Sequence, residues 1–150
     1  MGKRFLLFIL VITMLSITAL PAFAADFQGD DPEDEIVYYD DGSYAIISLH
    51  IEDATRSNTK TASKTFKYYN SSDVLQWTFK VTGTFSYNGT SATATAVSTS
   101  YTISNNCWKY DHATKSKSGN EVSGKGYFKK VSIIGSETVT IKCSKTGVIS

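Results

Sequence analysis

Apolar and polar residues alternate without a break from Trp77 to Tyr87. One set of alternate positions carries bulky apolar residues and a single glycine, and the other carries threonine, serine and lysine. A period of two is typical of a strand with one buried and one solvated face. We therefore expect the apolar set to line the inside of two stacked antiparallel layers. That set is Trp77, Phe79, Val81, Gly83, Phe85 and Tyr87.

The dipeptide Asn88-Gly89 follows this strand and is the strongest local signal for a β-hairpin. Both residues tolerate the positive φ angles of a two-residue type I′ turn. Such a turn predicts that Tyr87 faces Thr90 across the hairpin, with large residues of the first strand beside small residues of the second. A slip of one residue would move the aromatic rings into water, so the pattern specifies the register.

Six further segments have the composition of strands and are separated by turn-forming residues. Two of them change the side on which their apolar residues lie. For 97–103 we expect either a bend into the other sheet near Ser98 or apolar cover on both faces. For 122–134 we expect a β-bulge at Lys129-Lys130. The segments are 44–51, 65–69, 97–103, 107–114, 122–134 and 139–143.

The region after the N-terminus shows no 3.6-residue helical period. Seven or eight short strands separated by turns are typical of an all-β sandwich or barrel. The predicted fold class is an antiparallel β-sandwich, immunoglobulin-like, with 7–8 strands. It forms one domain that spans residues 42–150.

Residues 1–24 have the three parts of a signal peptide. Lys3 and Arg4 supply positive charge, 5–20 is an apolar run, and Ala22-Phe23-Ala24 fits a cleavage site. The alternative is a membrane anchor, but the apolar run is shorter than the roughly 20 residues that cross a bilayer as a helix. We expect cleavage, a secreted product that starts near Ala25, and no membrane span after cleavage.

Charge is distributed unevenly along the chain. Residues 26–41 contain eight acidic and no basic residues, whereas residues 42–150 contain 13 basic and six acidic residues. We expect 25–41 to be an acidic disordered leader, because such a segment buries little apolar surface. The alternative is an arm that folds back onto a basic face or guides a partner. Asp40-Asp41-Gly42 lacks the spaced ligands of a calcium loop.

The chain contains two cysteines, Cys107 and Cys143. In an exported protein an even number of cysteines favours a disulfide bond. A bond between these two would stabilise the fold by about 3–4 kcal/mol on the chain-entropy account. The alternative is two buried free thiols, because two thiolates alone are too few for a metal site.

Candidate catalytic residues are few. The histidines are His50 and His112, and His112 follows Asp111, so on a regular strand these two side chains point to opposite faces. The chain has no G-x-S-x-G motif, phosphate-binding loop, dinucleotide fingerprint or C-x-x-C pair, and no motif selects two carboxylates. We therefore expect no enzyme activity, no catalytic residue, no cofactor and no metal.

Lysines are concentrated in the C-terminal third of the chain. Lys125, Tyr127 and Lys129 fall on one face of a predicted strand, with a ring between two cations. This candidate binding face suits an anionic polymer, such as teichoic acid or an acidic glycan, or a sugar packed on Tyr127. The alternative is an outer face kept soluble by lysines. Export and the modest charge argue against nucleic acid.

The run Thr82 to Gly89, T-G-T-F-S-Y-N-G, occurs together with Trp108 and the C-terminal T-I-K-C-S-K-T-G-V-I-S. In these features the chain resembles a group of short, uncharacterised exported proteins of Gram-positive, gut-type bacteria. The resemblance covers about residues 42–150. It implies export and the β-domain, and it implies no activity.

These observations favour a secreted, non-enzymatic module that binds a cell-wall polymer, a glycan or a protein. The alternative is a small secreted antagonist of the bacteriocin or toxin kind, and a hydrolase is a third hypothesis. Because β-sandwiches host all three functions, the fold class does not decide among them.

Overall fold

The computed structural model describes residues 34–52 and 58–150. This part of the chain contains eight β-strands and no helix, and all its strand pairs are antiparallel. The predicted all-β class and strand number are confirmed. The strands are β1 (Glu35–Tyr38), β2 (Tyr44–Glu52), β3 (Thr59–Tyr69), β4 (Leu75–Tyr87), β5 (Ala92–Ile103), β6 (Lys109–Ser118), β7 (Glu121–Lys130) and β8 (Ile133–Lys142).

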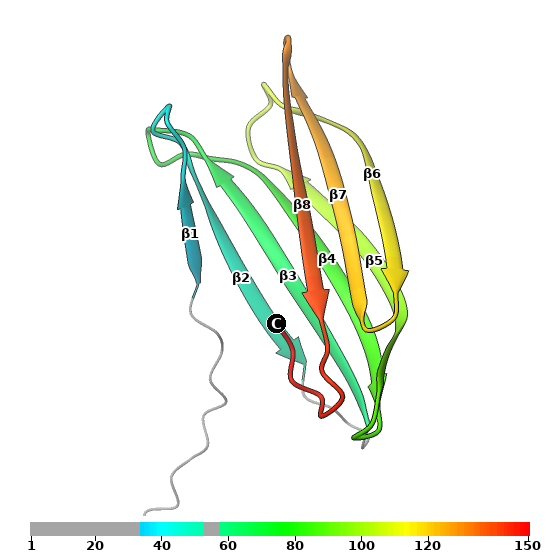
Figure 1. Cartoon of the computed structure of the whole chain (residues 1–150). Coiled ribbons are helices and arrows are strands. Elements are labelled where there is room, and N and C mark those ends of the chain that lie inside the picture. The colour runs from blue at the N-terminus through cyan, green and yellow to red at the C-terminus, as the bar shows by residue number, and fades with distance from the viewer. Residues whose placement is uncertain (1–33, 53–57) are drawn as a thin grey trace, which may run out of the picture.

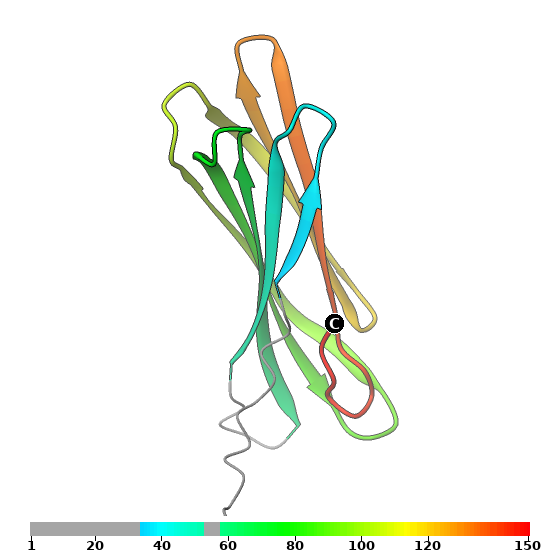
Figure 2. The ribbon, with the colours of Figure 1, turned by 90° about the vertical axis from the view of Figure 1, so that its left-hand side faces the viewer.

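The strands form two sheets that lie face to face as a sandwich (Figure 1). One sheet has five strands in the order β1-β2-β3-β4-β5, and the other has three in the order β6-β7-β8. Figure 2 shows that the β1–β2 and β7–β8 turns lie at the same end of the molecule. Each sheet is a meander, whereas immunoglobulin domains have Greek-key connections. The predicted immunoglobulin likeness therefore extends to the two-layer architecture and not to the strand order.

Strand β4 lies at the centre of the core. Phe79, Val81 and Phe85 are fully buried and Trp77 is 3% exposed, so the alternating apolar face of β4 points between the sheets as predicted. The second sheet supplies Phe128, whose ring stacks on Trp77 with centroids 4.0 Å apart. Burial of each large apolar side chain stabilises the fold by about 1.5–3 kcal/mol. The two layers are thus held together chiefly through β4.

The β4–β5 hairpin has a longer turn than the predicted two-residue turn. Tyr87 pairs with Ala92 rather than with Thr90, which leaves a four-residue loop. The Asn88 Oδ1 atom accepts hydrogen bonds from the backbone N–H groups of Thr90 (3.0 Å) and Ser91 (2.8 Å). Asparagine makes such local bonds readily, and here they satisfy the donors of the longer loop. The predicted register is therefore wrong by two positions next to the turn, where Ala92 and Ala94 still face inward as predicted, and by three positions from Thr84 onward.

A β-bulge in β5 explains why its apolar residues change sides. Phe85 pairs with Ala94 but Thr84 pairs with Ala96, so Thr95 is an extra residue in the ladder. The Thr95 hydroxyl donates a hydrogen bond of 3.0 Å to the Thr84 carbonyl. One inserted residue reverses the alternation beyond it. The expected bend of this strand into the other sheet is therefore wrong, since β5 stays beside β4 along its whole length.

Residues 122–134 form parts of two strands, so the single bulged strand predicted there is wrong. Lys130 pairs with Ile133, and the chain reverses at Val131-Ser132. Val131 has a φ of 54° and is 100% exposed. This left-handed conformation is uncommon for a β-branched residue. The reversal carries none of the glycine, asparagine or aspartate that usually marks a turn, which is why the pattern does not predict it.

The five-stranded sheet begins inside the predicted acidic leader. Strand β1 pairs with β2, with Glu35 opposite Ile47, and the turn after it is held by Asp41. The Asp41 Oδ1 atom accepts hydrogen bonds from the backbone N–H and the hydroxyl of Ser43. The predicted domain boundary at residue 42 is therefore too late. The predicted signal peptide (1–24) and the leader up to residue 33 lie outside the described residues.

The described part of the chain contains no helix long and apolar enough to cross a membrane.

The predicted disulfide between Cys107 and Cys143 does not form. Both cysteines are free, and Cys107 is exposed whereas Cys143 is buried. Lys109, just after Cys107, is level with Ile134 through the β6–β7–β8 ladder. Most of β8 separates Ile134 from Cys143, a distance of roughly 30 Å at about 3.3 Å per residue. A disulfide needs Cα atoms within about 7 Å of each other.

We expect one thiol per chain to react with a chromogenic thiol reagent in the native protein and two after unfolding in urea. Cys107 is exposed, whereas burial raises the pKa of the Cys143 thiol and so lowers its reactive thiolate fraction. Cys107→Ser should abolish the native reaction. A protein without reactive thiols in either state, assayed without reductant, would instead contain the disulfide.

The sheets approach each other closely at two glycines of β7. A Cβ atom on Gly126 would lie 2.8 Å from the Phe79 ring, and one on Gly124 would lie 2.6 Å from Val81. Real Cβ atoms essentially never come closer than 3.0 Å to such neighbours. The absent side chains therefore let the β7 backbone pack directly on the aromatic face of β4.

We expect Gly126→Ala to lower the free energy of unfolding by about 1–3 kcal/mol, because the added methyl group overpacks the core against Phe79. Urea unfolding measures the change. Ser116→Ala, at an exposed position of β6, is the control and should stay within about 0.5 kcal/mol of the wild type. Equal stability of the Gly126 variant and the control would contradict the close approach of the sheets.

Candidate functional site

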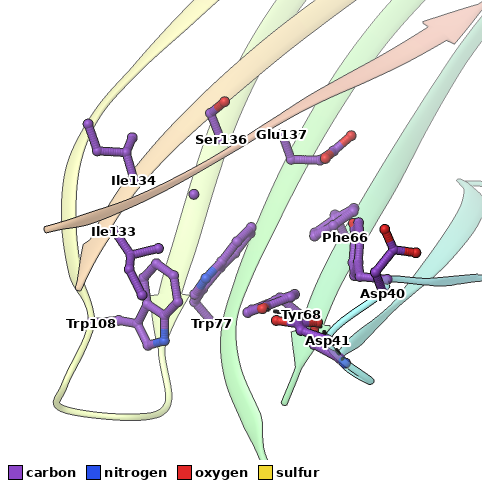
Figure 3. Close-up of a pocket in the computed structure, with 13 residues that line it drawn as sticks. Asp40, Asp41, Phe66, Tyr68, Trp77, Trp108, Ile133, Ile134, Ser136 and Glu137 are labelled. Atoms are coloured by element: carbon purple, nitrogen blue, oxygen red, sulfur yellow. Dashed lines mark hydrogen bonds between the residues drawn. The ribbon is translucent and has the colours of Figure 1, made fainter. Parts of the chain in front are cut away.

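A cleft opens between the sheets where the β1–β2 turn faces the start of β8 (Figure 3). Its volume is about 570 Å³, within the usual range for small-ligand sites. The β1–β2 turn, β3, β4, the start of β6 and β8 all contribute to it. The lining residues are Tyr39, Asp40, Asp41, Ser43, Phe66, Tyr68, Trp77, Trp108, Ile133, Ile134, Gly135, Ser136 and Glu137.

The floor of the cleft is aromatic. Tyr68 and Trp77 are opposite each other in the β3–β4 register, with ring centroids 5.3 Å apart. Phe66 stacks on Trp77 at 5.4 Å, and Trp108 meets Tyr68 edge-on at 5.9 Å. Tyr39 from the β1–β2 turn continues the ring cluster to the rim, 6.0 Å from Tyr68. The aromatic core of the sandwich thus extends into an open site.

A hydrogen-bond network holds Trp108 in place. The Gln76 Oε1 atom accepts bonds from Trp108 Nε1 (3.2 Å) and from Asn105 Nδ2 (3.0 Å). The Gln76 Nε2 atom donates to the Val74 carbonyl at 2.7 Å. Gln76 is only 2% exposed, and these bonds satisfy its side-chain polar groups. One indole of the cleft is therefore oriented by the protein itself.

The second indole has no such partner. Among the described residues, Trp77 Nε1 is the buried side-chain polar atom that makes no hydrogen bond. An unpaired buried donor costs about 1–3 kcal/mol, so its presence in a folded protein calls for an explanation. Trp77 lines the cleft, and its buried N–H group is left without a hydrogen-bond partner beside it.

The charged groups of the cleft are all carboxylates. Asp40, Asp41 and Glu137 line it, and its lining contains no lysine, arginine or histidine. Hydrogen bonds from Ser43 lower the pKa of Asp41, whereas burial raises the pKa of Glu137. Burial, followed by the charge of Glu137, raises the pKa of Tyr39. The cleft is therefore negatively charged at neutral pH, and Glu137 is its least solvated carboxylate.

We expect Glu137→Gln to raise the thermal stability of the unliganded protein at pH 7. Burial raises the pKa of Glu137 in the folded state. The Glu137 carboxylate therefore holds a proton more tightly in the folded protein than in the unfolded chain. Stability is then lost as the pH rises through the window just above the ordinary glutamate pKa. The amide removes that loss, so its advantage should be present at pH 7 and absent at pH 4. Equal melting temperatures at pH 7 would contradict the buried charge.

The predicted binding face lies on the outer side of the three-stranded sheet, away from the cleft. Lys125, Tyr127 and Lys129 share this face, since the residues between them are buried. The Lys125 Nζ atom lies 5.2 Å from the centre of the Tyr127 ring, and His112 stacks on the same ring at 4.2 Å. Lys129 forms an ion pair of 2.7 Å with Asp111. The three side chains thus share one sheet face, and one of its two cations is already paired with a carboxylate.

Asp111 and His112 do not point to opposite faces, so this expectation is wrong. The β6–β7 ladder shifts between Tyr110 and His112, which makes Asp111 a bulge residue. Its carboxylate lies 2.8 Å from His112 Nδ1 and also accepts a hydrogen bond from Lys129. These two hydrogen bonds lower the pKa of Asp111. Both side chains are exposed on the outer face of the three-stranded sheet. His50 is also exposed, but it lies on β2 of the five-stranded sheet.

In the described part of the chain, His, Cys, Asp and Glu side chains do not gather in groups of three or more that could hold a metal ion.

Sequence patterns place none of the cleft residues in a functional site. Trp77 and Trp108 were expected only as strand residues, and Glu137 was one of several unselected acids. The one signal in the sequence is that each tryptophan lies at the start of an alternating stretch, which places two indoles near strand ends. Both tryptophans lie in one cleft with Glu137 only because of the way in which the two sheets stack, which the sequence pattern does not specify.

Comparison of the chain with protein-family models, with curated proteins and with solved structures gives no match.

Proposed function

We propose that the protein is a non-enzymatic binding module and that its ligand site is the aromatic cleft, with a glycan as the ligand. The observation that carries this proposal is the cleft itself, in which aromatic rings and carboxylates line one open space between the sheets. Secretion, which would give the module access to cell-wall or other extracellular glycans, is part of the proposal and rests on the signal-peptide pattern of residues 1–24.

The cleft combines the two kinds of contact that a sugar ring needs. Sugar rings have an apolar C–H face, which packs on aromatic rings such as those of Tyr68 and Tyr39. Their hydroxyl groups need polar partners, and the carboxylates of the cleft can accept hydrogen bonds from them. A few polar groups on an apolar surface are typical of ligand sites.

A second candidate surface is the outer face around Tyr127. The cation–π contact of Lys125 with Tyr127 and the stacked His112 favour an anionic polymer there. The pairing of Lys129 with Asp111 reduces the positive charge of that face. We therefore place the principal site in the cleft and retain the outer face as the alternative site.

We expect soluble oligosaccharides to change the intrinsic tryptophan fluorescence of the protein. The chain contains two tryptophans, and both line the cleft, so fluorescence reports on this site directly. Tyr39→Ala should weaken binding by about 3–10-fold, since one aromatic contact contributes about 0.5–1.5 kcal/mol. Titration with chitin, cellulose and mannan oligosaccharides and with peptidoglycan fragments measures the dissociation constants.

Two matched variants separate the cleft from other surfaces. Tyr101, on β5 outside the cleft, is 48% exposed, compared with 38% for Tyr39, so Tyr101→Ala should leave binding unchanged. Tyr127→Ala tests the outer face. Loss of binding in the Tyr127 variant with retention in the Tyr39 variant would move the site to the outer sheet. Failure of the whole panel to bind would refute the glycan module.

A further inference from the structure

We infer that the cleft selects glycans that carry a protonated amino group, and that Glu137 is the counter-ion of that group. This inference rests on the proposed function, because it names the class of ligand for the same site. It goes further by predicting that the charge of the sugar substituent, rather than the ring alone, determines affinity.

The charge of the lining supports this selection. Asp40, Asp41 and Glu137 are its charged residues, and the lining includes no cationic side chain. The described residues, 34–52 and 58–150, carry 12 basic and nine acidic side chains. The cleft is thus negatively charged although basic residues outnumber acidic ones in the described chain. The net charge of the protein would therefore not attract a cation, whereas the charge of the cleft would. An acidic polymer such as teichoic acid would be repelled at this site.

Glu137 is the carboxylate whose surroundings best suit an ion pair with a ligand. It lies on the inward-facing side of β8, in alternation with the buried Val139 and Ile141, and it is only partly exposed. None of the ion pairs among the described residues includes Glu137. Lys125 is the cation that acts on it through space, from the neighbouring strand β7. A half-buried carboxylate without an ion-pair partner gains more from an incoming ammonium group than a solvated one does.

The rings beside Glu137 suit the same group. Tyr39 and Tyr68 lie together at the rim and floor, and Trp108 stands edge-on to Tyr68. Aromatic faces attract ammonium ions as well as apolar C–H groups. Figure 3 shows Glu137 above this ring cluster, with Asp40 and Asp41 on the side opposite Trp108. An amino sugar could thus place its ring on the aromatic floor and its ammonium group near the Glu137 carboxylate.

The decisive experiment compares two tetrasaccharides that differ only in their amino groups. The chitin tetramer carries N-acetyl groups, and the fully deacetylated chitosan tetramer carries amines. Titrations followed by tryptophan fluorescence are carried out at pH 5.5, where the amines are protonated. We expect the chitosan tetramer to bind the wild type at least about 10-fold more tightly, a difference typical of one desolvated cation–π and charge contact.

Glu137→Gln should reduce this preference to less than about threefold, because it should weaken binding of the chitosan tetramer far more than binding of the chitin tetramer. The control is Glu121→Gln, which removes a carboxylate paired with Lys142 at the far end of β7 and should keep the full preference. Equal binding of the two tetramers by the wild type, or an unchanged preference in the Glu137 variant, would overturn the amine selection and leave the glycan module standing. If no saccharide of the whole panel binds, the module itself fails.

A further titration tests whether the ammonium group must be attached to a sugar ring. Trilysine offers ammonium groups on a peptide instead of a sugar ring. We expect it to bind at least about 10-fold more weakly than the chitosan tetramer, because it lacks the C–H face that packs on the aromatic floor. Equal or tighter binding of trilysine would overturn the assignment to a glycan.

Discussion

The contact between the aromatic face of β4 and the glycine-containing face of β7 is the interaction on which the rest of the structure depends. Phe79, Val81 and Phe85 are fully buried there, and Gly124 and Gly126 bring the β7 backbone onto them. The two cysteines do not cross-link the layers. The stability of the sandwich therefore comes from close packing of large rings against a backbone without side chains, an arrangement in which even one added methyl group is felt.

The same packing accounts for the cleft. At Gly124 an added Cβ atom would come within 2.6 Å of Val81 in the facing sheet, whereas at Gly135 of β8 it would lie 3.6 Å from Trp77 in the facing sheet. The second sheet has three strands and the first sheet has five. Strand β8 is the edge strand of the smaller sheet on the side of β1 and β2. The aromatic core consequently continues past the edge of the smaller sheet and becomes the floor of an open site.

Much of the fold could be predicted from alternation alone, because the period of two in β4 and β2 directly reflects burial on one face. The errors lie where one residue interrupts that period. Thr95 and Asp111 are bulge residues held by hydrogen bonds, and Val131 turns the chain without a turn-forming residue. The candidate site could not be predicted, since its residues come from five separate segments. Only the stacking of two sheets brings Glu137 to the rings of Tyr68 and Trp108.

The cleft also carries two features that stability alone does not explain. The Trp77 N–H group is buried without a partner, and Glu137 is held where burial raises its pKa. Each costs folding free energy, and each would be relieved by removing the polar group. A purely structural core would be better served by phenylalanine and glutamine at these positions. Their coincidence in one aromatic cleft is the physical reason to place recognition there, and a cationic ligand would offset the cost at the half-buried Glu137 carboxylate.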